Sequence, residues 1–167
     1  MNDKRKKICS AYLKAREEFL DFGNSDDVLH GNDNIVGRIG EAIAHSFLEQ
    51  QGRRPIVVKN QSNAGYDIIC DGGKDFISVK MITAENKWGN TSQIKHKWTE
   101  LIGIELGENQ KVIKLGVISR NSFEGEQKKR GRRLEPNFSR AMLKPNGVFA
   151  TGGKLYEGKE LEGFKLL

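Results

Sequence analysis

The chain has 167 residues, of which 37% are hydrophobic and 30% charged, a balance typical of one soluble domain with a single core. No apolar run approaches the roughly 20 residues of a membrane span, and the basic start lacks the apolar segment of a secretory signal, so we expect a cytoplasmic protein with no membrane partner. Two cysteines at unrelated positions exclude a disulfide framework or a cysteine-rich zinc site, whereas the net charge of +6 suits a polyanionic partner.

The first predicted element is an amphipathic helix over residues 4–21. The apolar residues that define it recur at near-helical spacing: Ile8, Tyr12, Ala15, Phe19 and Phe22. Gly23 and the asparagine after it are expected to stop this helix, and a loop rich in Asn, Asp and Gly follows.

A second helix is predicted from residue 35 to residue 51, with Asn34 or Asp33 as its N-cap. Gly40 lies inside it, and glycine lowers helix propensity by up to about 1 kcal/mol, so its presence indicates close packing against a strand or a phosphate backbone. Glu41 comes next, where the ordinary fate of a helical glutamate is a solvated face.

Three strands are predicted after this helix. Residues 55–58 form the first, and residues 66–70 and 76–82 form two more that are rich in β-branched and aromatic residues. Between the last two, residues 71–73 read Asp-Gly-Gly, which tolerate the positive φ angles of a tight hairpin turn. An antiparallel hairpin is therefore expected here.

Thr91 or Ser92 is expected to cap a third helix that ends at Gly107, and residues 111–119 read as a central strand. The inward-facing residues of this helix are Ile94, Trp98, Leu101 and Ile102. The predicted order is helix, three strands, helix, strand: an α/β fold with a small mixed sheet flanked by helices. An irregular C-terminal extension follows, with a short helix over residues 136–143 and paired strands over residues 148–151 and 154–156.

The hairpin carries a carboxylate and an amine at the ends that pairing brings together. Asp67 lies near the start of the first strand and Lys80 near the end of the second. Ser78 and Lys80 are two residues apart, so both point to one face of the sheet. A structural Asp–Lys pair is one interpretation. With Glu41 added, the set also fits phosphodiester cleavage, in which carboxylates hold a divalent cation and a lysine assists the attacking water.

This arrangement resembles the restriction-endonuclease-like PD-(D/E)XK nuclease superfamily, with Glu41 in the first core helix, Asp67 on a hairpin strand, and Ser78-Val79-Lys80 on the next. The resemblance covers about residues 35–119 of a single nuclease-like domain, residues 1–167. It implies that Asp67 binds Mg²⁺, with Mn²⁺ as a substitute, that Glu41 completes the metal shell, and that Lys80 is catalytic. It also places the carbonyl of Val79 within reach of the metal.

The sequence departs from the family pattern at Ser78, where an acidic residue is expected. A hydroxyl is a weaker ligand than a carboxylate for a hard cation. Gln93, Glu100 and Glu85 are candidates to replace the missing group, or Glu41 alone suffices, because Mg²⁺ commonly keeps several waters.

Basic residues gather in two further places. Lys87, Lys95 and Lys97 surround the start of the predicted third helix, beside Trp88, and indicate either phosphate contacts or a solvated basic face with one buried Trp. The densest basic cluster is Lys128, Lys129, Arg130, Arg132 and Arg133. It is expected to be a phosphate-contacting loop or a solvated one.

The leading hypothesis is a Mg²⁺-dependent endonuclease that hydrolyses DNA, in restriction, phage DNA processing or junction resolution. Cutting both strands of a duplex usually takes two active sites, so a homodimer is expected. Two alternatives keep the same fold: a non-catalytic nucleic-acid-binding protein in which Ser78 marks a lost site, and an RNA-cleaving nuclease of the toxin type. A third is a protein–protein module whose basic surface meets an acidic partner.

Overall fold

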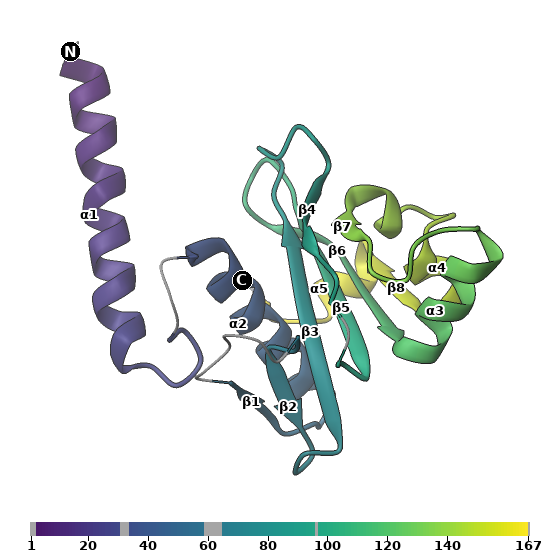
Figure 1. The fold of residues 1–167 in the computed structure, drawn as a ribbon. Helices are drawn as coiled ribbons and strands as arrows, with labels where there is room; N and C mark the ends of the chain where they lie inside the picture. Colours follow the sequence, from purple (N-terminus) through teal and green to yellow (C-terminus); the bar gives the residue numbers. More distant parts are fainter. Residues whose placement is uncertain (1–2, 31–33, 59–64, 96, 167) are drawn as a thin grey trace.

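The computed structural model describes residues 3–30, 34–58, 65–95 and 97–166, which form a mixed α/β fold (Figure 1). In chain order the elements are α1 (Asp3–Ser25), α2 (Ile35–Gln50), β1 (Pro55–Val57), β2 (Ile68–Cys70), β3 (Asp75–Ile82), β4 (Asn90–Gln93), β5 (Glu100–Leu106), β6 (Val112–Ser119), α3 (Arg120–Lys129), β7 (Asn137–Ser139), the 3-10 helix η1 (Arg140–Leu143), α4 (Val148–Gly152), β8 (Lys154–Glu157) and α5 (Lys159–Glu162).

The main sheet has six strands in the order β1-β2-β3-β5-β6-β8. β3 and β5 are parallel, and the other neighbouring pairs are antiparallel. A separate small sheet pairs β4 with β7. The expectation of a small mixed sheet flanked by helices is therefore confirmed.

The elements with strong local signals form where the sequence predicts them. The side chain of Asn34 caps α2 by accepting a hydrogen bond from the Gly37 amide at 3.2 Å, whereas Asp33, the other proposed cap, lies outside the described residues. β2 and β3 form the predicted antiparallel hairpin, with Ile68 opposite Ile77. The turn residue Asp71 and the two glycines after it all have positive φ.

The predicted third helix is wrong, because its residues form β4, a loop and β5. Its four inward-facing residues are nevertheless all buried: Ile94, Trp98, Leu101 and Ile102. β5 is a central strand covered on both faces, and such strands read as continuous apolar runs that also satisfy a helical spacing. Lys97, whose φ is 82°, breaks any continuous helix before β5 begins.

The C-terminal part is more regular than expected. Residues 148–152 form a helix instead of the predicted strand, and the predicted helix over 136–143 divides into β7 and η1. Residues 154–157 do form a strand, but β8 pairs with β6 and completes the main sheet.

Two apolar layers lie on opposite faces of the sheet (Figure 1). On one face α2 packs closely on β3, where a Cβ added to Gly40 would lie 3.1 Å from Met81 Cβ. On the other face Phe149 of α4 packs directly over Gly116, which pairs with Gly103 across β5 and β6. A Cβ at either strand glycine would approach a phenylalanine ring to within 3 Å, so the Phe149 ring can pack here only because both strands carry glycine.

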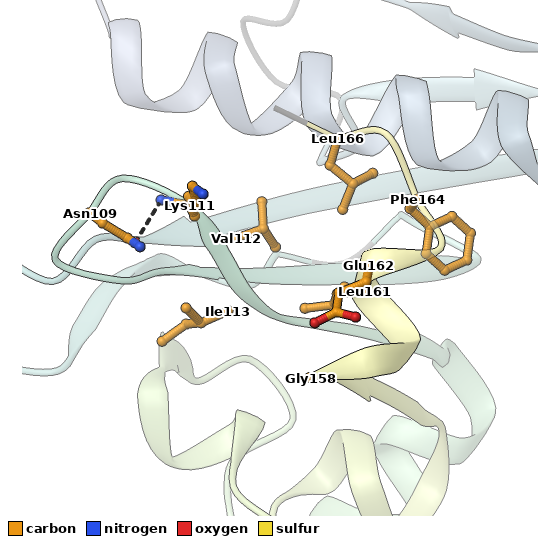
Figure 2. A pocket seen from close by; sticks show the side chains of 9 residues that line it. All are labelled: Asn109, Lys111, Val112, Ile113, Gly158, Leu161, Glu162, Phe164 and Leu166. Atoms are coloured by element: carbon orange, nitrogen blue, oxygen red, sulfur yellow. Dashed lines mark hydrogen bonds between the residues drawn. The ribbon is translucent and has the colours of Figure 1, made fainter.

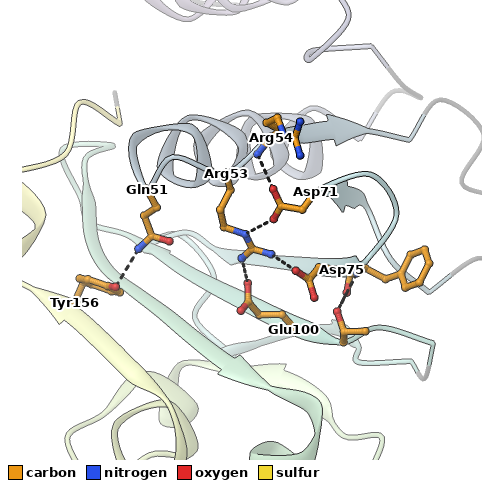
Figure 3. Close-up of polar contacts among 9 residues, drawn as sticks. Gln51, Arg53, Arg54, Asp71, Asp75, Glu100 and Tyr156 are labelled. Carbon is orange, nitrogen blue, oxygen red and sulfur yellow. Dashed lines mark hydrogen bonds and ion pairs between the residues drawn. The ribbon is translucent and has the colours of Figure 1, made fainter.

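An ion-pair cluster lies at the end of the sheet near the hairpin turn (Figure 3). The guanidinium of Arg53 contacts three carboxylates, at 3.2 Å to Asp71, 2.9 Å to Asp75 and 2.7 Å to Glu100. It thereby joins the segment after α2 to the β2–β3 turn and to the start of β5.

α1 projects from the rest of the structure (Figure 1). It extends past the expected stop at Gly23 to Ser25, and its contact with the body is made at its C-terminal half, where Arg38 of α2 lies 5.1 Å from the centre of the Phe19 ring. None of the described helices combines the length and apolar character that crossing a bilayer requires.

Candidate active site

The candidate site forms where β2 stops and β3 continues. β2 pairs with β3 only as far as Ile68, opposite Ile77, whereas β3 runs on to Ile82 with β5 along its other edge. The backbone amide of Val79 is the first along this open edge, and it donates a 2.6 Å hydrogen bond to Oδ2 of Asp67. The Asp67 carboxylate thus accepts the hydrogen bond that a backbone carbonyl of β2 would accept if β2 were longer. It pairs the Val79 amide, which would otherwise be left without a partner at the open edge of the strand.

Ser78 and Lys80 lie on the face of the sheet that carries α3 and α4. Their partners in β5 are Leu101 and Gly103, and both partners contact that layer. The Ser78 hydroxyl donates to Oδ2 of Asp67 at 3.4 Å, a long bond, and the residue is only 1% exposed. The predicted common face of Ser78 and Lys80 is therefore confirmed.

Glu41 reaches the same place from the opposite layer. It lies on α2, one residue after the close contact of Gly40 with β3, and it is buried. A cavity of about 280 Å³ opens at the edge of β3 and is lined by Asn34, Val36, Gly37, Glu41, Asp67, Val79, Lys80, Met81, Thr91 and Ser92. The structure therefore brings together Asp67, Lys80 and Glu41, which come from three separate elements.

A second cavity, of about 210 Å³, adjoins the first and shares Asp67, Lys80 and Ser92 with it. Its lining residues are Gly65, Tyr66, Asp67, Ser78, Lys80, Ser92, Gln93 and Lys95. β4 therefore contributes Thr91, Ser92 and Gln93 to the site. The sequence predicted the first two only as helix caps, because no local signal shows that this segment crosses the hairpin.

Burial raises the pKa of Asp67, against the opposing effects of the Lys80 ammonium and of the hydrogen bonds from Val79 and Ser78. A buried carboxylate is costly to ionise without a compensating charge. Additional positive charge in the site would therefore stabilise the ionised form of the Asp67 carboxylate.

The donor set fits a hard divalent cation that keeps part of its water shell. Among the described residues, no three His, Cys, Asp or Glu side chains gather closely enough to form a metal site by themselves. Two carboxylates line the cavity, as does Val79, and the buried hydroxyl oxygen of Thr91 has no hydrogen-bond partner in the described part of the chain. Mg²⁺ commonly binds through one or two carboxylates plus waters, so the residues present are compatible with it.

Two of the three candidates to replace the missing acid lie elsewhere. Glu100 is held by Arg53 at the far end of the sheet (Figure 3), and Glu85 is exposed and accepts a 2.7 Å hydrogen bond from Gln110. Hydrogen bonds, first that from Thr83, lower the pKa of Glu85. Gln93 is the one candidate that lines the site.

The predicted basic residues divide into site and surface groups. Lys95 lines the site, whereas Lys87 and Lys97 are exposed on loops beside β4. Lys128, Arg132 and Arg133 are exposed at and after the end of α3.

The other two members of the basic cluster are engaged with Glu126. Lys129 lies 2.9 Å and Arg130 3.2 Å from its carboxylate oxygens. Hydrogen bonds from Lys129, Thr151 and Arg130 lower the pKa of Glu126 to about 2. Part of the predicted phosphate-binding loop therefore forms ion pairs within the fold.

A larger cavity, of about 470 Å³, lies between β6 and the C-terminal segment (Figure 2). Its lining mixes polar and apolar residues: Asn109, Lys111, Val112, Ile113, Gly158, Leu161, Glu162, Phe164 and Leu166. It contains none of the predicted site residues.

No protein-family model matches this sequence, and no curated protein matches it at a significant level.

The raised pKa of Asp67 predicts how the stability of the fold depends on pH. The folded state retains the Asp67 proton to higher pH than the unfolded chain does, so this group makes the free energy of unfolding fall as pH rises from about 4 through the folded-state pKa. The variant D67N keeps an acceptor for the Val79 amide but cannot ionise. Its stability relative to the native protein should therefore rise between pH 4 and pH 8 in urea unfolding without divalent metal. E108Q, at an exposed carboxylate in the turn between β5 and β6, controls for the lost charge. A D67N variant that loses relative stability as pH rises would contradict this prediction.

Proposed function

We propose that this protein is a metal-dependent endonuclease that hydrolyses DNA phosphodiester bonds, built on a variant of the restriction-endonuclease-like core. The observation that carries the proposal is the meeting of Asp67, Lys80 and Glu41 in one cavity at the open edge of β3. The parallel neighbours β3 and β5 support it too, although β4 and a loop connect them where the family pattern has a helix.

Asp67 and Glu41 are the residues that would hold Mg²⁺ or Mn²⁺, with the Val79 carbonyl as a further oxygen donor. A cation bound there supplies Lewis-acid activation of a water molecule and of the scissile phosphate. Lys80 adds a positive charge in the same cavity, where it can orient the attacking water and offset charge on the phosphate. The exposed Lys95 lines the adjoining cavity, where a phosphate contact would position the substrate.

Ser78 favours one alternative, a nucleic-acid-binding protein that retains the fold without catalysis. Its hydroxyl is buried against Asp67 where the family has a carboxylate. In the enzyme hypothesis, Glu41 and coordinated waters make up for the missing carboxylate. In the binding hypothesis, Asp67 and Lys80 form a structural pair, and removing either leaves nucleic-acid binding unchanged.

Cleavage of supercoiled plasmid and of structured RNA, with Mg²⁺, Mn²⁺ or EDTA, tests the proposal. We expect metal-dependent cutting of the plasmid, and a rate loss on the order of 100-fold or more for D67A and for K80A. K74A removes an exposed lysine from the same hairpin and should cut normally.

Cutting of RNA alone would replace the DNA assignment with the RNA-cleaving alternative. No cutting of either substrate, with nucleic-acid binding unchanged in D67A and K80A, would favour the binding protein.

A further inference from the structure

The loop between β3 and β4, residues 83–89, displays a tryptophan to solvent. Trp88 is 90% exposed, whereas Trp98, the other tryptophan, is 4% exposed and packs against Phe123. The interpretation of this region as a solvated basic face with a buried tryptophan is therefore wrong for Trp88, and its exposed indole remains to be explained. Single exposed apolar residues are common on proteins, so exposure alone identifies no site.

The loop that carries Trp88 is held in one conformation by contacts on both of its sides. The guanidinium of Arg140 donates to the carbonyls of Thr83, at 2.9 Å, and Asn86, at 3.3 Å, and is itself anchored by Glu105 at 2.7 Å. The Asn86 side chain donates to the Asn90 carbonyl at 2.7 Å and accepts from the amide of the glycine after Trp88 at 3.0 Å. The indole is thus presented by a braced turn, which lowers the entropy cost of binding a ligand.

The position of this loop links it to the candidate site. Trp88 is three residues before Thr91, which lines the main cavity, so the intervening chain spans at most about 10 Å. The positive side chains nearest in the chain are Lys87, the exposed residue that precedes Trp88, and Lys95, which lines the adjoining cavity. Glu85 is the acidic residue of the loop, and it is hydrogen-bonded to Gln110.

We propose that Trp88 is a stacking platform for an unpaired nucleobase of the nucleic acid that enters the site. An exposed indole that follows an exposed lysine in the chain matches a base joined to a phosphate, since the base can stack on the indole and the phosphate can meet the positive charge. Within an intact duplex the faces of the bases are covered by their neighbours. The substrate class is therefore a nucleic acid with a single-stranded stretch, an open end, a branch or an unstacked step. This inference rests on the proposed function for its meaning, but its test does not require cleavage.

The test is tryptophan fluorescence in EDTA, where no metal-dependent cutting interferes. Subtracting the fluorescence of W88A from that of the native protein gives the signal of Trp88, because both proteins contain Trp98. We expect an oligothymidine 20-mer and a branched duplex to quench this signal strongly and a blunt duplex of equal length to quench it little. W88A should bind the unpaired probes roughly tenfold more weakly or worse, W88F should recover part of the loss, and I56A, at an exposed apolar residue of β1, should bind normally.

Equal affinity of W88A and the native protein for the unpaired probes would overturn the inference, as would a preference for the blunt duplex. A Trp88 signal that responds to protein concentration and to no nucleic acid would overturn it too, and would assign the indole to a protein contact. Quenching of Trp88 without any cleavage in the plasmid assay would support the stacking site and contradict only the proposed nuclease activity. Failure of the stacking inference can therefore be distinguished from failure of the proposed function.

A separate observation concerns α1. Four of its large apolar side chains are exposed, at 59% for Ile8, 64% for Tyr12, 62% for Leu13 and 61% for Phe22, whereas Phe19 is half-buried against Arg38. The helix has 23 residues and a length of about 35 Å, and a helix in a protein owes most of its stability to packing of its apolar face. Ile8, Tyr12, Ala15, Phe19 and Phe22 follow alternating spacings of four and three, the pattern of a helix–helix seam.

We infer that α1 pairs with α1 of a second copy of this chain, in antiparallel orientation. The charges of the helix select both the partner and the direction. Its start is strongly basic, at residues 4–7, whereas its second half is weakly acidic, because Glu17, Glu18 and Asp21 outnumber Lys14 and Arg16. Antiparallel pairing sets each basic end beside an acidic segment, whereas parallel pairing would oppose like charges. Ala15 near the centre lets the two backbones approach.

Sedimentation of the full chain across a range of concentrations should show twice the chain mass, with a dissociation constant that increases with salt. The variant Y12K/L13K should sediment as a monomer, and I56K, a matched change on β1, as the native dimer. A charge swap separates pairing from simple loss of the helix: K4E/K6E/K7E and E17K/E18K/D21K should each be monomeric and should form a heterodimer when mixed. A native protein that stays monomeric at about 100 µM, or a dimer that Y12K/L13K leaves intact, would overturn the inference.

Discussion

The hydrogen bond from the Val79 amide to the Asp67 carboxylate decides where the site lies. β2 begins at Ile68, one residue after Asp67, so β3 continues beyond Ile77 with one edge open to a cavity and the other paired with β5. Had β2 run on, a strand carbonyl would take this amide and the cavity would close. The Asp67 carboxylate accepts the hydrogen bond of this amide instead and also places a buried carboxyl group near Lys80.

The close packing of α2 on β3 depends on the same strand. Gly40 lets the helix approach Met81, and Glu41 follows directly, so the helix acid is delivered to the cavity by the contact that also buries the apolar core. Stability and site geometry are therefore coupled: a side chain at Gly40 that separated α2 from β3 would also move Glu41 away from Asp67. This coupling gives a physical reason for a costly glycine inside a helix.

The parts of the fold that the sequence predicted are those with local signals. The Asn34 cap and the Asp-Gly-Gly turn depend on residues within a few positions of one another, and they place Glu41 on α2 and Lys80 on β3 as predicted. Asp67 lies immediately before β2, not inside the predicted strand over residues 66–70. The helix predicted for the segment from β4 to β5 was wrong because the apolar spacing of this segment fits a helix and a central strand equally well. Contacts with residues distant in the sequence decide between the two. Thr91 and Ser92 were missed as site residues for the same reason, since only the crossing of β4 over the hairpin brings them there.

The central claim is that Asp67 and Glu41 form a site for a hard divalent cation. Titration of the protein with Mn²⁺, followed by the loss of its free-ion electron paramagnetic resonance signal, measures this directly. The account predicts one bound Mn²⁺ per chain, little or none in D67A, weaker binding in E41Q, and normal binding in E85Q, which changes an exposed carboxylate outside the cavity. Unchanged Mn²⁺ binding in D67A, or no binding by the native protein, would contradict it and leave Asp67 as a structural residue of the β3 edge.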